Sequence, residues 1–265
     1  MSIFLHELRF YRRNTAIWTA SLCAGTALLF SMFPAFAGNT QALEDVLRNY
    51  PDVVQKAFGL SPETIGTVPG FYSFIVTFLM LCGAVQAISL GISVLSKEIA
   101  GKTADFLLTR PLTRGRVLTA KLLAVLCCVA ATSAVSIGAT FAMAFSVKDA
   151  AFDLGPFVLM ALSFFWVQLI FLALGFLIGA AAPKIRSVLP ISLSTVFGLF
   201  IVGMVAAALD QKDLYYLSPF KYFDTVGILQ TSAYQTSFVV TAAAVTALAV
   251  CAGYAVYGRR DIQAA

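Results

Sequence analysis

Six long apolar runs limit what this chain can become more than any other feature. Each exceeds the roughly 20 helical residues needed to cross a hydrocarbon core about 30 Å thick. Apart from Lys121, near the start of the third run, none contains Asp, Glu, Lys, Arg or His. The sequence therefore predicts an all-α integral membrane protein, one transmembrane domain over residues 1–265. The expected spans lie near 15–37, 71–95, 117–146, 156–182, 187–209 and 236–257.

Composition agrees with a membrane location. Apolar residues make up 60% of the chain and charged residues 12%, against about 45–50% and about 25% in soluble domains. The net charge of +5 is spread along loops between spans, so it does not indicate nucleic acid. All five cysteines lie inside apolar runs, which disfavours a disulfide framework or a zinc site. We expect no metal site and no catalytic residue.

The distribution of basic residues predicts the orientation of the spans. With both termini in the cytoplasm, the inner segments hold 13 Lys and Arg residues and the outer segments hold five. Acidic residues show the reverse preference, with four inside and nine outside. Short cytoplasmic loops of membrane proteins carry the excess of Lys and Arg. Both termini are therefore expected on the cytoplasmic side.

The N-terminus allows two interpretations. Phe4, Leu8 and Tyr11 repeat at helical spacing, which predicts an interfacial amphipathic helix over residues 2–13. Basic residues, an apolar run and Ala35-Phe36-Ala37 also resemble a cleavable signal peptide. The run from 15 to 37 exceeds the 7–15 apolar residues of such peptides, so we expect an uncleaved first span.

A segment that is both charged and apolar separates the second and third spans. Residues 97–110 contain Glu98 and Lys102 at a spacing that supports an exposed helical pair, and Pro111 should end that helix. Thr113 is a candidate N-cap for the third span. Ile99 and Phe106 share one face of the short helix. These apolar groups could enter the lipid headgroups, or they could dock on a cytoplasmic partner.

Three stretches together resemble a known family. They are KEIAGKTADFLLTRPLTR at 97–114, YLSPFKYFD at 216–224 and YGRRDI at 257–262. The chain resembles ABC-2-type permeases along its whole length. These permeases are the membrane subunits of one class of ATP-binding-cassette exporters, and they work in dimers.

The resemblance implies roles for three groups of residues. The helix after the second span would be a coupling helix that docks on the ATPase: Glu98, Lys102, Asp105, Phe106, Leu107, Leu108, Arg110, Pro111 and Arg114. The N-terminal helix would lie close to the ATPase through Phe4, Leu8 and Arg12. An outer segment, residues 210–235, would include Pro219, Phe220 and Lys221 before the last span.

The resemblance also implies partners and a cofactor. The chain has no G-x-x-x-x-G-K-[ST] phosphate loop, so it is not expected to be an enzyme. ATP and Mg²⁺ would instead be bound by a separate ATPase subunit. A second permease copy or homologue and membrane lipid complete the expected partners, in the cell membrane of a prokaryote.

Polar residues inside the spans are candidates for a translocation pathway that opens by alternating access. They are Ser73, Thr77, Gln86, Ser89 and Ser93 in the second span, and Ser192 and Thr195 in the fifth. The alternative is that these side chains hydrogen-bond neighbouring helices, as most such residues do. A cleft of this kind with many nearby Phe side chains would suit an amphipathic or lipid-like substrate.

Three other classes of function remain open. An ion-coupled secondary transporter or channel usually needs charged groups within the membrane, which the spans hardly provide. A membrane enzyme would need paired titratable groups, and the only histidine, His6, lies on the expected interfacial helix. A membrane anchor or sensor bound to an ATPase, without transport, would carry the same sequence features.

Overall fold

The computed structural model describes residues 3–38, 45, 47, 49–51, 54–55, 64–100, 113–147, 152–182, 185, 187–209 and 211–259. Over these residues the chain is helical and contains no strand. Six segments are long and apolar enough to cross a membrane, as the sequence predicts. They comprise α1 (Ile3–Ser31), which continues into the short α2 (Phe33–Gly38), α5 (Val68–Ala100), α7 (Arg114–Val147), α8 (Leu154–Ala181), α9 (Val188–Ala208) and α12 (Thr236–Arg259).

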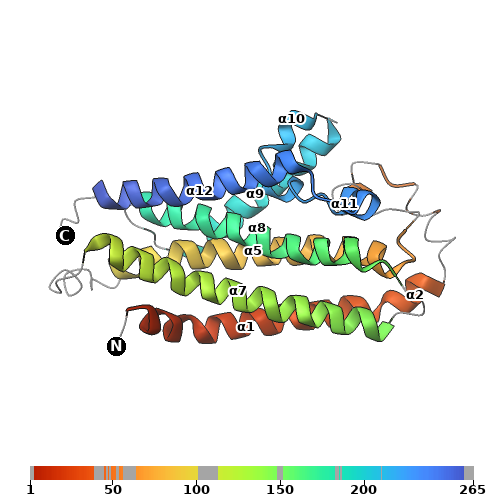
Figure 1. Cartoon of the computed structure of the whole chain (residues 1–265), viewed down its shortest axis with the longest axis horizontal. Coiled ribbons are helices and arrows are strands. Elements are labelled where there is room, and N and C mark those ends of the chain that lie inside the picture. The colour runs from red at the N-terminus through yellow and green to blue at the C-terminus, as the bar shows by residue number, and fades with distance from the viewer. Residues whose placement is uncertain are drawn as a thin grey trace.

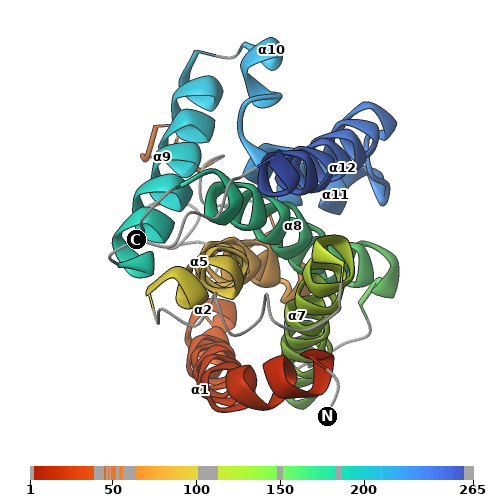
Figure 2. The ribbon, with the colours of Figure 1, turned by 90° about the vertical axis from the view of Figure 1, so that its left-hand side faces the viewer.

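Most of the long helices run side by side along the longest axis, whereas α9 is inclined to them (Figures 1 and 2). The start of α1 and the end of α12 lie at the same end (Figure 1). Viewed along the helices, α5 and α8 occupy the middle, with α1 and α7 on one side and α9 and α12 on the other (Figure 2). The closest pairings are α5 with α8 and α1 with α7. Of the six, α5 and α8 are the most buried, whereas α9 and α12 expose most of their surface.

The first helix combines two expected elements. Residues 3–31 form one helix, although a separate interfacial helix was expected over 2–13. Its first turns lie across the end of the bundle before the helix turns along it (Figure 2). The helix is interrupted at Met32, just before Pro34 in the first turn of α2. Proline lacks a backbone N–H and clashes with the preceding turn, which accounts for the interruption.

Glycines bring α5 and α8 into backbone contact. A Cβ atom added to Gly175 would lie 2.4 Å from the carbonyl oxygen of Ile88, and one on Gly91 would lie 2.5 Å from that of Leu172. A Cβ on Gly179 would lie 2.9 Å from the Ile92 carbonyl oxygen. The Gly-x-x-x-Gly spacing in α8 therefore allows a close approach, and α5 is the helix that approaches.

Helices α5 and α7 extend past the expected spans towards the segment that separates them. The α5 helix continues to Ala100 instead of ending near residue 95. Thr113 directly precedes α7, and its carbonyl accepts a hydrogen bond from the Val117 N–H at 3.3 Å. At 33 and 34 residues, both helices are about 50 Å long. They therefore exceed the thickness of a hydrocarbon core and must tilt or protrude.

The segment between α9 and α12 is built from short helices. It contains α10 (Lys212–Tyr215), the 3₁₀ helix η1 (Pro219–Lys221) and α11 (Thr225–Thr231). Asp224 caps α11 by accepting a hydrogen bond from the Gly227 N–H at 3.0 Å. In Figure 1 these elements gather at the end of the bundle away from the start of α1.

Candidate functional site

The expected coupling helix lies mostly outside the described residues. Lys102, Asp105, Phe106, Leu107, Leu108, Arg110 and Pro111 fall within residues 101–112, whose placement is not described. Glu98 belongs to the last turn of α5, and Arg114 is the first residue of α7. The described helices thus deliver both ends of this segment to the end of the bundle where α1 begins (Figure 1).

A cluster of buried charges joins three helices at that end. The Glu7 carboxylate on α1 accepts a hydrogen bond from the Lys97 ammonium on α5. Lys121 on α7 places its Nζ atom 3.6 Å from the other carboxylate oxygen of Glu7. Exposed fractions of the three side chains are 3% for Glu7, 21% for Lys97 and 0% for Lys121. We call these three residues the Glu7 cluster.

Each lysine of the Glu7 cluster has a second stabilising contact. Lys121 donates a hydrogen bond to the Val94 carbonyl on α5 at 3.0 Å. Lys97 lies over two aromatic rings of α1, with its Nζ 4.1 Å from the centre of Phe10 and 4.9 Å from that of Tyr11. Both distances are within the range of a cation–π interaction. The Val94 carbonyl and the two aromatic rings therefore stabilise the lysine charges in addition to the Glu7 carboxylate.

A hydrogen bond close to the cluster also connects α1 to α5. Ser93, one of the expected pathway residues, donates a hydrogen bond to the Tyr11 hydroxyl at 3.0 Å. Among the N-terminal residues expected near an ATPase, Phe4 and Leu8 are half-buried and Arg12 is exposed. The N-terminal part of α1 thus packs on α5 with one face and leaves Arg12 on the other.

A second polar network lies between the helices further along the bundle. Gln86 on α5 donates to Thr132 on α7 at 2.9 Å, and the Thr132 hydroxyl lies 3.0 Å from that of Thr19 on α1. Gln168 on α8 donates to the Gln86 side chain at 3.3 Å and accepts from Ser133 on α7. We call these five residues the Gln86 network. The network includes residues of four helices, and each of these hydrogen bonds joins two different helices.

The other pathway candidates are dispersed. Ser73 and Thr77 donate to backbone carbonyls of their own helix, as do Ser192 and Thr195. Ser89 buries its hydroxyl without a hydrogen-bond partner. The described hydrogen bonds do not join the seven residues into one cluster, and their role in translocation stays a prediction.

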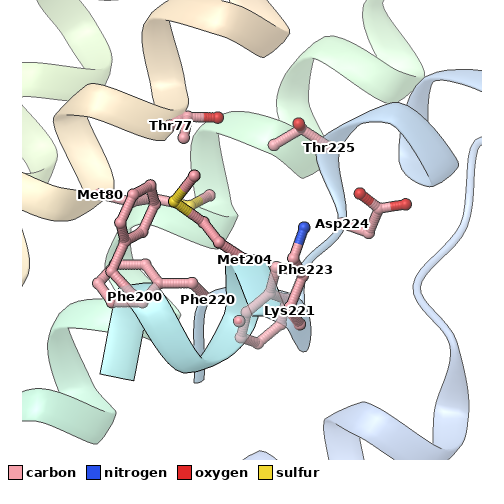
Figure 3. A pocket seen from close by; sticks show the side chains of 10 residues that line it. Thr77, Met80, Phe200, Met204, Phe220, Lys221, Phe223, Asp224 and Thr225 are labelled. Carbon is pink, nitrogen blue, oxygen red and sulfur yellow. The ribbon is translucent and has the colours of Figure 1, made fainter. Parts of the chain in front are cut away.

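One cavity does bring together residues from two expected groups. It has a volume of about 30 Å³ and is lined by Thr77 together with Phe220 and Lys221 of the outer segment. Figure 3 shows the Met80 and Met204 side chains close together beside the Phe200 and Phe220 rings, with Lys221 nearby. This volume holds about one water molecule, so the outer segment closes over α5 and α9 with little free space.

The outer segment is held to the bundle by specific hydrogen bonds. Ser218 donates to the Leu199 carbonyl on α9 at 2.8 Å, next to Gly203, where a Cβ atom would lie 2.6 Å from the Ser218 hydroxyl. Pro219 is buried, and the Phe220 ring packs 5.1 Å from that of Phe171 on α8.

Two tyrosine hydroxyls add a further hydrogen bond to the bundle and one within the outer segment. The Tyr234 hydroxyl donates to the Leu159 carbonyl on α8 at 2.6 Å, and the Tyr222 hydroxyl donates to the Tyr216 carbonyl at 2.6 Å. Burial raises the pKa of both tyrosines, and a hydrogen bond with Ser163 partly offsets this increase in pKa for Tyr234. The tyrosines therefore stay protonated, and able to donate, to a higher pH than tyrosine in water.

A large apolar cavity lies between α8 and α12. Its volume is about 520 Å³, which is within the usual size of ligand pockets. Trp166 and Ile170 line it from α8, and Ala243 and Val250 line it from α12. Thr246 contributes a hydroxyl to this surface, which is otherwise almost entirely hydrocarbon.

A comparison with protein families decides the class of protein. The model of a family described as ABC-2 family transporter protein matches residues 1–262. The chain belongs to the ABC-2 transporter family. The match covers all six membrane-spanning helices and the segment between α5 and α7. No match is found among curated proteins.

Membership of the ABC-2 family agrees with the observed architecture. The protein is a multi-pass membrane protein with six spanning helices, and ABC-2 permeases are membrane components that are not themselves ATPases. The Glu7 cluster was not anticipated from the sequence. Glu7 and Lys97 were counted only as inner-side charges, and so was Lys121. The usable signal was Lys121 itself, a single charge inside an apolar run of an otherwise uncharged span.

Proposed function

We propose that this chain is the permease subunit of an ABC-2-type exporter, driven by a separate ATP-binding-cassette ATPase subunit. The partner binds ATP and Mg²⁺, while this chain and a second permease copy or homologue form the pathway. In this proposal the termini are cytoplasmic and the membrane is the cell membrane of a prokaryote. The observation that supports it most is the family match over residues 1–262.

The positions of the end of α5 and the start of α7 are consistent with docking of the segment between them on such a partner. Both lie at the end of the bundle where α1 begins (Figure 1), and the two helices are joined through Glu7. By the count of basic residues, this is also the cytoplasmic end. When ATP brings two ATPase subunits together, the coupling helices of the two permeases follow. The cleft between the permeases then changes its opening from one side to the other.

The class of substrate follows from the apolar interior. The cavity between α8 and α12 presents almost only hydrocarbon to its contents, and an apolar cavity of this kind does not hold water well. An amphipathic or lipid-like molecule can place its apolar part in such a site while its polar part stays near the water interface. We therefore infer this class of substrate rather than an inorganic ion.

The docking role is tested by changing charge and polarity within the expected coupling helix. Glu98→Arg and Leu107→Asp should leave membrane insertion intact but reduce co-purification with the ATPase subunit. Matched controls are Asp213→Arg and Leu217→Asp, because both residues are exposed on the outer segment. If the coupling-helix variants retain the ATPase and normal substrate-stimulated ATP turnover, the docking assignment is wrong.

Reconstitution separates this proposal from its rivals. In vesicles containing the permease and its ATPase subunit, transport of a fluorescent lipid analogue should require hydrolysable ATP and continue after ion gradients are collapsed by ionophores. Transport that follows an imposed ion gradient without ATP would instead indicate a secondary transporter. ATP turnover that no lipid probe stimulates, with no movement of the probe, would indicate an anchor or sensor.

A further inference from the structure

The Glu7 cluster occupies an unusual position relative to residues 98–113. Lys97 is the last residue before that stretch, and Lys121 lies two helical turns after it, on α7. The same carboxylate on α1 contacts both lysines. One acidic side chain therefore connects the N-terminal part of α1 to the two helices through which any force on this stretch must enter the bundle.

Burying the three charges of the Glu7 cluster costs free energy. Moving charges out of water is unfavourable, and a well-packed apolar substitute is often equally stable or more stable than a buried ion pair. Packing alone therefore does not require charges at this place. What charges add is a defined geometry, since Glu7 can satisfy both lysines only in one arrangement of the three helices.

Contacts around the cluster restrict that arrangement further. Lys97 lies over the rings of Phe10 and Tyr11, and Tyr11 also accepts a hydrogen bond from Ser93 one turn earlier on α5. Lys121 bonds the Val94 carbonyl as well as approaching Glu7. The first turns of α1 are thus held against α5 by the contacts of Lys97 and of Ser93. Helix α7 is held against both α5 and α1 through Lys121.

We propose that Glu7 is a positioning residue for coupling: it fastens the N-terminal part of α1 to the ends of α5 and α7. A displacement of residues 98–113 then moves three helices as one unit. This inference rests on the proposed function, because the displacement comes from the ATPase partner. Energy is transmitted only through contacts that hold during the movement, and the Glu7 cluster supplies such contacts on both sides of the stretch.

A double-mutant design separates positioning from stability. In nanodiscs containing permease and ATPase, Glu7→Gln leaves Lys121 buried without its carboxylate, so the Tm of the permease should fall by about 6–12 °C. The ratio of ATP turnover by the complex to that of the ATPase alone should fall at least fivefold, roughly the lower limit of measured couplings between sites.

The variant Glu7→Gln/Lys121→Met then also removes the buried charge of Lys121. Its Tm should return to near that of the wild type, while the turnover ratio stays low because Lys97 and α7 are no longer joined through α1. If the double variant recovers both Tm and turnover ratio, or if Glu7→Gln lowers only the Tm, the cluster is merely structural and the inference is overturned. Should Glu7→Gln fail to fold, the double variant alone carries the comparison.

A control and a second measurement complete the test. Tyr234→Phe removes a partly buried hydrogen bond at the opposite end of the bundle, so it should lower the Tm without changing the turnover ratio. In the permease alone, the double variant should increase hydrogen exchange of residues 3–13, and Tyr234→Phe should not. A wild-type permease that binds no ATPase would overturn the proposed function, whereas unchanged exchange in the double variant would overturn the fastening by Glu7 specifically.

Discussion

The substitution Gly175→Ala tests a close backbone contact between α5 and α8. The added methyl would lie 2.4 Å from the Ile88 carbonyl oxygen, whereas ordinary van der Waals contact begins near 3.4 Å. Helices α5 and α8 would therefore have to separate by about 1 Å locally. The obstacle is backbone, and the methyl is fixed to the α8 backbone, so neither group can rotate away.

The magnitude follows from two opposing effects. Overpacking a tight contact costs about 1–3 kcal/mol, and a gap of about 1 Å removes up to half of the dispersion energy of each contact that it opens. Alanine in a helix recovers up to about 1 kcal/mol relative to glycine. We expect a net loss near the upper end of this range, about 2 kcal/mol, which corresponds to a decrease in Tm of roughly 4–8 °C.

The assay is thermal unfolding in a lipid nanodisc, with Gly138→Ala as the control. Gly138 lies on α7, and no other atom lies within 4 Å of a methyl added there. The Tm of the Gly138→Ala variant should therefore equal or exceed that of the wild type. Gly91 belongs to the same crossing from the α5 side, so adding Gly91→Ala to Gly175→Ala should cost less than the sum of the single changes. If Gly175→Ala unfolds at the wild-type temperature, α5 and α8 do not approach each other as described.

Three further perturbations probe the polar contacts. Gln168→Leu should destabilise by about 1–3 kcal/mol because it leaves buried polar groups unpaired, and adding Ser133→Ala should recover part of that loss in chemical unfolding. Ser218→Ala removes the hydrogen bond to the Leu199 carbonyl and should cost about 1 kcal/mol, detected as faster hydrogen exchange in residues 219–223. Burial raises the pKa of Tyr234, so its contribution to stability is fully present below about pH 10 and is lost as pH rises through the raised pKa. Tyrosinate absorbance should show late deprotonation together with loosening of the outer segment, and Tyr234→Phe should reduce this pH dependence to the part that Tyr222 contributes.

The membrane-spanning architecture could be predicted from the sequence because it depends on local properties. Length, apolar character and the near absence of charge define each span independently of the others. All six expected spans correspond to helices that are long and apolar enough to cross a membrane. The Gly175-x-x-x-Gly179 spacing is also a local property of the sequence, and it permits a close approach of another helix without identifying that helix.

The candidate site was harder to predict because it depends on which helices are neighbours. Gln86 was singled out as a pathway residue, but its partner Gln168 lies on α8, 82 positions later in the chain. Nothing local in α8 marks Gln168 as its partner. Lys121 falls inside the third apolar run and enters the orientation count only as an inner-side charge, and the sequence does not indicate that it is buried against α5 and α1.

The described contacts place α5 at the centre of any mechanism that the proposed function requires. At one end α5 is joined to α1 and α7 through Lys97 and Glu7. In its middle the backbone of α5 touches that of α8 at Gly91 and Gly175. Because the two backbones are in contact there, we expect a movement of the inner end of α5 to be passed on to α8.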